Sequence, residues 1–267
     1  MKVISKEKAI RSIVKSSVES FAEGFSSRHI GEKDDPNGTI NMKIHNPFIA
    51  VLGDELRYYT ALVRSFDSAL GNMLEKMAIN IAELFFEVYK KVEGYIFEEQ
   101  ILQIAELLES YKNRTKNPSL QDYELLKIKS GSKKVKTHES DYYLFDKENS
   151  FHYLIELKIG GDLDNKKARA EKEALLEQFC ILYNNQQTDN IKCFFATAYN
   201  RFGEGKDWNQ GRVLQFFSKN ELLIGKDFWN FITKSENGYN LVLDEYSKNS
   251  YIIKNALEKI KKEYLGG

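Results

Sequence analysis

The sequence predicts an α/β fold in which a mixed central sheet is flanked by helices, with additional helices at both ends of the chain. Three observations predict it. Residues 141–145 and 151–159 are typical of two strands joined by a tight turn. An amphipathic segment at 164–183 and a buried strand at 192–199 follow, which together form a β-α-β crossover. Both ends of the chain carry apolar residues at helical spacing.

The length of 267 residues suits one large domain or two small ones. We expect a single domain over residues 1–267. Its helical amino-terminal part covers 1–112, its α/β core about 113–215, and its helical carboxyl-terminal part 216–267.

The terminal parts are expected to be helical almost throughout. Apolar residues recur at spacings of three and four in residues 5–25, in a long span from 48 to 88, and in 95–111. Residues 28–47 are interpreted as a loop, and 252–264 as the last amphipathic helix. Either terminal helix has apolar surface to spare for a subunit contact.

Composition excludes several classes of function. The chain has 39 basic and 39 acidic residues, so it is no general binder of polyanions, and any nucleic-acid contact requires local clustering. The sequence has no apolar run near twenty residues and no signal-peptide pattern, which predicts a cytoplasmic protein without a membrane partner. Cys180 and Cys193 lack the spacing of a metal site and are interpreted as buried, reduced thiols.

A carboxylate and an ammonium group share one face of the second predicted strand. Because strand side chains alternate, Glu156 and Lys158 project from the same side and Leu157 from the other. A solvated surface salt bridge is the common explanation of such a pair. The apolar run at 153–159 favours a strand covered on both faces, where charges are costly unless they are paired or bind a metal. Asp141, on the neighbouring strand, can meet them.

A second stripe runs along the long helix expected at 48–88. It contains the small residues Ser68, Gly71, Ala78 and Ala82, together with Glu75. Small residues let a helix approach a sheet closely, so Glu75 is expected at that contact. The alternative is an ordinary solvated glutamate.

The spacing Asp141…Glu156-x-Lys158 resembles the catalytic signature of the PD-(D/E)xK nucleases. Three flanking segments resemble more narrowly the restriction endonuclease family of TdeIII and MjaII, whose members recognise GGNCC. These segments are 45–48 (HNPF), 64–78 (RSFDSALGNMLEKMA) and 222–232 (LLIGKDFWNFI). With the core signature, they cover most of residues 45–245.

The resemblance implies a restriction-endonuclease-like core and a type II enzyme that hydrolyses double-stranded DNA with Mg²⁺, for which Mn²⁺ substitutes. The implied metal ligands are Asp141, Glu156 and the main-chain carbonyl of Leu157, all of them hard oxygen donors. Glu75 is a candidate for a further ligand, and Lys158 is expected to orient the attacking water or to stabilise developing charge. A cognate DNA methyltransferase is implied as a partner. Asp146 is the second candidate for the role of Asp141, although it is expected near the hairpin tip.

Basic and polar residues around this signature are candidates for DNA contacts. Eight basic residues between 112 and 136 lead into Asp141, although lysines also protect sheet edges from pairing. Basic residues in the first turns of the helix that follows Asp164 are unfavourable for the helix dipole. The loop 200–212 has side chains suited to reading base edges. The alternative is an ordinary surface loop that is anchored by its tryptophan. The residue pair at 165–166 matches, with a displacement, the Pro- and Asn-containing stretch expected in the family. The candidates are Lys133, Lys134, Lys136, Asn165, Lys166, Lys167, Arg169, Arg201, Trp208, Asn209 and Arg212.

A palindromic target predicts a homodimer with one catalytic centre for each DNA strand. Two alternative functions stay open at this point. One is a PD-(D/E)xK nuclease of DNA repair or junction processing. The other is a non-catalytic nucleic-acid-binding or assembly module, in which the Glu-x-Lys pair is structural.

Overall fold

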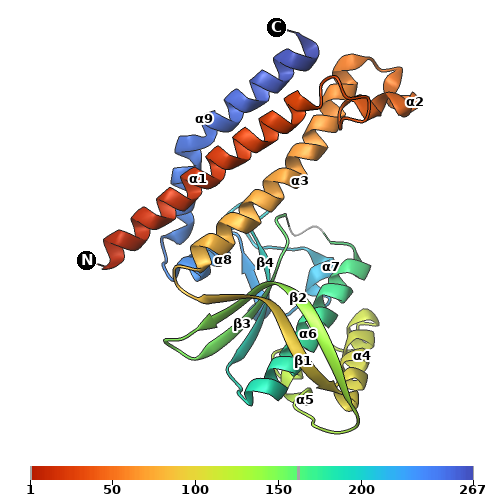
Figure 1. Cartoon of the computed structure of the whole chain (residues 1–267). Coiled ribbons are helices and arrows are strands. Elements are labelled where there is room, and N and C mark those ends of the chain that lie inside the picture. The colour runs from red at the N-terminus through yellow and green to blue at the C-terminus, as the bar shows by residue number, and fades with distance from the viewer. Residues whose placement is uncertain (1, 161–162, 267) are drawn as a thin grey trace. The chain divides into compact units, whose positions relative to one another are not determined.

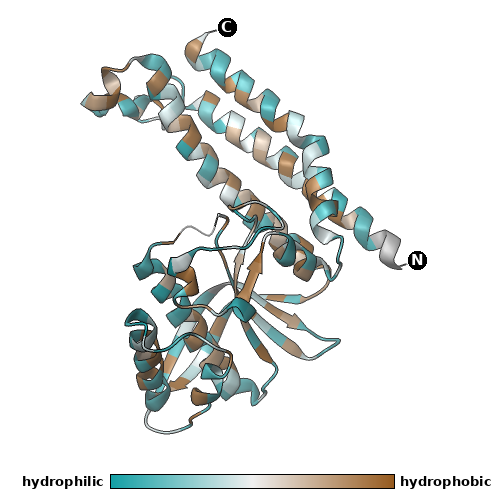
Figure 2. Ribbon diagram, turned by 180° about the vertical axis from the view of Figure 1, so that it is seen from behind, coloured by the Kyte–Doolittle hydropathy of each residue, from teal (hydrophilic) through white to brown (hydrophobic). Residues whose placement is uncertain are grey.

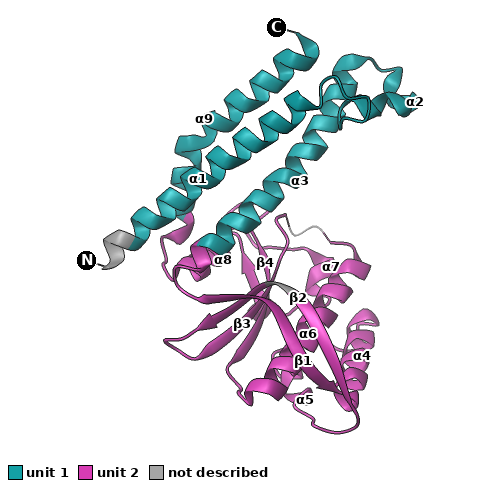
Figure 3. Cartoon of the chain, viewed as in Figure 1, with its two compact units in different colours: residues 1–80, 240–267 teal, residues 81–239 magenta. Residues whose placement is uncertain are grey.

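A computed structural model of the chain describes residues 2–160 and 163–266, and the side chains of all of these except residues 2–5 and 140–141. Its contacts divide the chain into two compact units (Figure 3). Unit 1 contains residues 1–80 and 240–267, and unit 2 contains residues 81–239. Both ends of the chain therefore belong to unit 1.

Among the residues that the structure describes, unit 2 is built on a mixed sheet of five strands, whose order in the sheet follows the order in the chain (Figure 1). The first three strands pair antiparallel, and the last three pair parallel. The expected mixed α/β architecture is confirmed. The strands are β1 (Glu87–Phe97), β2 (Lys133–Asp146), β3 (Phe151–Leu157), β4 (Ile191–Thr197) and β5 (Leu222–Ile224).

Helices cover both faces of this sheet. On β4, Cys193 faces α6 (Asn165–Gln186), where its Sγ lies 3.9 Å from the carbonyl oxygen of Leu175. The next side chain, Phe194, faces the opposite way and meets Phe231 of α8 (Lys226–Thr233), with 5.7 Å between ring centroids. Because strand side chains alternate, α6 and α8 lie on opposite faces. The remaining helices of unit 2 are α4 (Glu98–Lys112), α5 (Asp122–Leu125), α7 (Gly211–Leu214) and the 3₁₀ helix η2 (Lys219–Glu221).

The helix α6 is fixed by its cap and by a buried ion pair. Asp164 caps its first turn, as expected, by accepting a hydrogen bond of 2.8 Å from the Lys167 amide. Further along, the ammonium of Lys172 pairs with the carboxylate of Glu221, and the Tyr123 hydroxyl donates to the same carboxylate at 2.6 Å. Lys172 and Glu221 are both at most 1% exposed, so this cluster joins α6 to η2 inside the core.

Unit 1 is helical, and α1 lies between α3 and α9 (Figure 1). Phe25 of α1 meets Phe66 of α3 edge-to-face at 5.7 Å, and Tyr264 of α9 donates a hydrogen bond of 2.8 Å to the main chain of His29. Along α1 and α9, hydrophobic and hydrophilic residues alternate, as expected of amphipathic helices (Figure 2). The elements are α1 (Lys2–Gly31), η1 (Asn41–His45), α2 (Pro47–Ala50), α3 (Asp54–Ala82) and α9 (Gly238–Leu265).

The largest error of the sequence-based prediction lies at β1. The long helix ends at Ala82 instead of continuing to residue 88, and the helix expected from residue 95 begins only at Glu98. The buried positions Val92 and Ile96 are four residues apart, a spacing that fits both a helix and a strand. Hydrogen-bonded pairing with β2 stabilises residues 87–97 as a strand instead of a helix. The amino-terminal part of the chain is therefore not helical throughout.

Smaller differences occur elsewhere. The first helix continues to Gly31, into the segment expected to be a loop, and β2 begins eight residues earlier than expected, at Lys133. The short strand β5 interrupts a part expected to be helical. Cys180 and Cys193 are buried free thiols, as interpreted, and burial raises the pKa of Cys193 to about 12. None of the described helices has an apolar stretch long enough to cross a membrane.

Candidate active site

The side chains of Glu156 and Lys158 lie together at the carboxyl end of β3. The amide of Lys158 donates to the carbonyl of Ala196 at 2.9 Å, so the parallel pairing with β4 continues past Leu157. This pairing keeps the strand alternation, and the carboxylate of Glu156 forms an ion pair with the ammonium of Lys158, as that alternation predicts. Glu156 is 8% exposed, whereas the Lys158 side chain is 32% exposed and reaches solvent.

Glu171 of α6 is a third charged group at this position. Its Oε1 lies 3.2 Å from Nζ of Lys158, so the ammonium is held between carboxylates from β3 and α6. Sequence reasoning missed Glu171, although a signal was present. Position 171 lies on the same face of α6 as the buried residues Ala168 and Leu175, where an ordinary solvated glutamate is not expected.

Asp141 is placed by the backbone alone. Tyr142 on β2 pairs with Ile155 on β3, so Asp141 and Glu156 are the next residues along these two strands. The side chain of Asp141 lies outside the described residues, and its role as a metal ligand stays a prediction. Glu75 is a half-buried residue of α3 in unit 1, and its role also stays a prediction.

The oxygen atoms at the end of β3 suit a hard cation. Glu156 and Glu171 supply carboxylates that meet at the same ammonium, and Leu157, which follows Glu156 in the chain, supplies a main-chain carbonyl; these are the ligand types that Mg²⁺ takes. Among the side chains that the structure describes, no three of the types His, Cys, Asp and Glu gather into a metal cluster.

Tyr199 approaches the chain just beyond Lys158. A methyl group built on Gly160 would lie only 2.7 Å from the Tyr199 hydroxyl oxygen, so a side chain at this position would collide with the phenol. Tyr199 itself is 48% exposed and follows β4 at its carboxyl end. Sequence reasoning missed this residue, although ligand groups gather at the carboxyl ends of parallel strands.

Asp146 lies far from these groups. It pairs with Phe151 where the β2–β3 hairpin turns, five residues along β3 from Glu156, which is about 16 Å at the rise of a strand. Its carboxylate accepts from Nζ of Lys234 at 2.9 Å and from the Asn149 side chain at 2.9 Å. Asp146 therefore holds the hairpin tip, as expected of the second candidate.

Several predicted DNA contacts are already engaged inside unit 2. Lys136 forms an ion pair with Glu177 of α6, and Nζ of Lys133 lies 4.4 Å above the ring of Tyr95. Burial alone would raise the pKa of the Glu177 carboxyl, but hydrogen bonds from His138 and Lys136 outweigh it and lower the pKa. The part of β2 that carries these lysines pairs with β1 alone, because the pairing of β2 with β3 covers only residues 142–146.

Other candidates divide into exposed and engaged residues. Arg169 forms an ion pair of 2.6 Å with Glu109 of α4. Besides Lys133, which is exposed although its ammonium lies over Tyr95, the exposed candidates are Lys134, Asn165, Lys166, Lys167, Arg201, Asn209 and Arg212. These exposed residues remain candidates for DNA contacts.

The prediction for Trp208 is wrong. This side chain is only 9% exposed and packs 6.0 Å from the ring of Phe195 in the core of unit 2. Burying its large apolar ring stabilises the fold, so the tryptophan anchors the loop from inside, which was the alternative interpretation.

Comparison with known proteins gives one match and one negative result. A family model described as type II restriction endonuclease, HinfI, matches residues 6–250. The match covers nearly the whole chain, including both units and the end of β3. No curated protein matches the chain.

Proposed function

The chain belongs to the HinfI family of type II restriction endonucleases, and from this premise we propose that it hydrolyses duplex DNA with the side chains at the carboxyl end of β3. The observation that carries the proposal is the position of Lys158, whose ammonium lies between Glu156 and Glu171 and reaches solvent. Such a group is placed to meet a phosphate from outside the protein. Restriction is favoured over repair or junction processing, and over a non-catalytic module, by the family match.

Each residue of the site has a separate task in this proposal. Glu156, the Leu157 carbonyl and Asp141 would hold Mg²⁺, with Glu75 or Glu171 as a further carboxylate. When bound, Mg²⁺ polarises the phosphate and lowers the pKa of water near it.

The ammonium of Lys158 stabilises the negative charge that develops on the phosphoryl oxygens and orients the attacking water. Glu171 keeps this ammonium in place when Glu156 is occupied by the cation. Tyr199 presents its hydroxyl beside the chain that follows Lys158.

The recognition sequence belongs to the proposal as well. The match to the HinfI family does not support the resemblance to TdeIII and MjaII, and therefore does not support GGNCC. HinfI itself recognises GANTC. We propose a five-base palindrome with an unspecified central base, with GANTC as the first sequence to be tested and GGNCC as the second.

Digestion of a plasmid of known sequence tests the activity and the specificity together. The purified chain is incubated with Mg²⁺, and the ends of the products are mapped. Cuts confined to GANTC or GGNCC sites are the expected result, whereas intact plasmid at every Mg²⁺ and Mn²⁺ concentration would contradict a nuclease. Protection of the same sites by a DNA methyltransferase would support the proposed partner in a cytoplasmic restriction system.

The active form is expected to be a homodimer. A single site cuts one strand in one orientation, and two-fold symmetry matches a palindrome. Light scattering of the protein with a cognate duplex, with Ca²⁺ in place of Mg²⁺, should give two chains for each duplex. One chain for each duplex, combined with double-strand breaks made in a single encounter, would be the contrary result.

Replacing Glu171 with Gln is expected to slow cleavage by about tenfold, or about 1.4 kcal/mol of activation free energy. The substitution removes a negative charge 3.2 Å from the Lys158 ammonium and keeps the size of the side chain.

Glu173→Gln is the matched control, because Glu173 is an exposed residue of the same helix. A Glu171→Gln enzyme that cleaves DNA at the wild-type rate would show that Glu171 does not position Lys158.

A further inference from the structure

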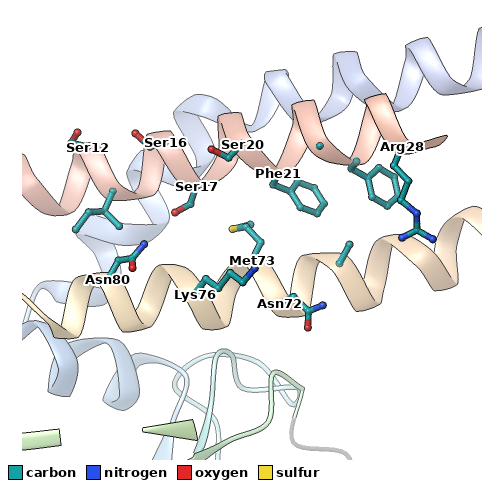
Figure 4. A pocket seen from close by; sticks show the side chains of 14 residues that line it. Ser12, Ser16, Ser17, Ser20, Phe21, Arg28, Asn72, Met73, Lys76 and Asn80 are labelled. Atoms are coloured by element: carbon teal, nitrogen blue, oxygen red, sulfur yellow. The ribbon is translucent and has the colours of Figure 1, made fainter. Parts of the chain in front are cut away.

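Unit 1 contains a groove between α1 and α3 that the proposed chemistry does not use (Figure 4). Its volume is about 590 Å³, and it continues into a second hollow of about 360 Å³. The two share Arg28, Ala69 and Asn72, so they form one surface of unit 1. From Ser12 to Arg28 this surface follows α1 for sixteen residues, which is about 24 Å.

The charges of this groove all have one sign. Its cationic residues are Arg28 and Lys76, with Lys43 and Arg64 in the second hollow, and none of the described residues lining either hollow is acidic. This distribution stands out because the whole chain has 39 basic and 39 acidic residues.

Three of the four cations are not neutralised by a protein carboxylate. Arg28 is engaged, since its Nε lies 2.9 Å from Glu32 and its Nη2 donates to Thr39. Lys43, Arg64 and Lys76 form no ion pair with any residue that the structure describes. Arg64 and Lys76 are exposed, so their charges act on whatever enters the groove.

The floor of the groove strengthens these charges. Phe21 and Met73 lie between the two helices in Figure 4, and with Phe25 they are buried to more than nine-tenths. Apolar walls of low dielectric constant focus the field of cations at a cleft and reduce its screening by water. The rim carries hydroxyl and amide donors from Ser16, Ser20, Asn72 and Asn80, groups that commonly bind phosphate oxygens.

A second copy of the chain is a poorer occupant than a polyanion. Two copies that met through this groove would bring their uncompensated cations together, and like charges facing each other disfavour association. A phosphodiester backbone neutralises the same cations and releases its own counterions.

We propose that the groove between α1 and α3 binds the phosphodiester backbone of DNA, as a sequence-independent contact separate from the catalytic end of β3. This inference rests on the proposed function and names a DNA-contacting surface for it. The length of about 24 Å allows contact with several successive phosphates.

The test measures DNA affinity against salt concentration for the double variant Arg64→Gln/Lys76→Gln of the full chain. Affinity at about 100 mM salt is expected to fall by about tenfold for duplexes with and without the cleavage site alike. The slope of log affinity against log salt should become shallower by about two, one for each lost phosphate contact. Lys254→Gln, which removes an exposed cation from α9, should leave both quantities unchanged.

The possible outcomes separate the two proposals. A double variant with wild-type affinity and slope, in an enzyme that cuts DNA, would overturn the groove and leave the nuclease assignment standing. A wild-type chain that neither binds nor cuts DNA would overturn both. Unchanged DNA binding together with a change of oligomeric state in light scattering would assign the groove to a second copy instead. Thermal unfolding of the double variant near the wild-type temperature excludes misfolding as the cause of a loss.

Discussion

Replacing Glu156 with Gln is expected to lower the rate of DNA cleavage by at least about 10²-fold, with little change in DNA affinity or thermal stability. The amide keeps the shape of the side chain and removes the charge that would hold the cation. The fold should tolerate the change, because the Lys158 ammonium retains Glu171 at 3.2 Å. Initial rates of plasmid cleavage with Mg²⁺, together with binding measured in Ca²⁺, separate chemistry from affinity.

Lys158→Ala and Asp141→Asn are expected to show the same separation of chemistry from binding. Wild-type rates for Glu156→Gln or Lys158→Ala would refute the site at the end of β3. A wild-type rate for Asp141→Asn alone would instead remove that residue from the metal ligands and favour Glu171 or Glu75 in its place.

Asp146→Asn is the control for the choice of aspartate, because it should preserve cleavage and lower stability. Burial would raise the pKa of Asp146, but hydrogen bonds from Asn149 and Lys234 outweigh it and lower the pKa. Folding therefore favours the charged carboxylate of Asp146. The stability that this carboxylate contributes is present above the unfolded pKa of about 3.9. That contribution disappears as the pH falls through the lower folded pKa, and wild type and variant should converge there in stability.

The second large effect is expected at the buried ion pair between α6 and η2. Replacing Lys172 with Met should destabilise the chain by about 3–5 kcal/mol, because it leaves the carboxylate of Glu221 buried without a cation. Tyr123 and Ser218 would still donate hydrogen bonds to Glu221, and these alone compensate a full charge poorly. Denaturant unfolding followed by circular dichroism measures the loss.

A second substitution should reverse most of this destabilisation. In Lys172→Met/Glu221→Gln the buried charge is absent, while the amide oxygen can still accept from Ser218 and the amide nitrogen can donate to the Tyr123 hydroxyl oxygen. Lys167→Met, an exposed change on the same helix, should cost less than about 1 kcal/mol. A single variant as stable as wild type would show that the Lys172–Glu221 pair does not stabilise the fold.

The strand that carries Glu156 and Lys158 was predictable because its signal is local. Alternation alone places Glu156 and Lys158 on one face, and the apolar run around them marks a buried strand. Glu171 was harder to find, since its contact with Lys158 depends on how α6 crosses the sheet, which the sequence pattern of either element does not contain. The strand β1 was not predicted because the four-residue spacing of the buried residues Val92 and Ile96 fits a helix and a strand equally well.

The sequence could not show which of the candidate DNA contacts are already engaged within the protein. Charge and position in the chain identify cations, but partners distant in the sequence decide whether a cation is available. Lys136 forms an ion pair with Glu177, forty-one residues away, and Arg169 forms one with Glu109, sixty residues away. Trp208 is buried in the core. The groove of unit 1 was not predicted at all, because its charges gather only when α1 lies against α3.

The division of the chain between the two units sets the order in which they can be completed during synthesis on the ribosome. Unit 2 is one continuous segment, residues 81–239, whereas unit 1 also needs residues 240–267. Because a chain emerges from its amino terminus at about 5–20 residues per second, the segment that carries Glu156 and Lys158 leaves the ribosome before α9 exists. Part of the α1 surface is covered by α9, including the main-chain carbonyl of His29, which accepts a hydrogen bond from Tyr264. This surface stays uncovered until α9 has been synthesised. Unit 1 can therefore be completed only after unit 2 has left the ribosome.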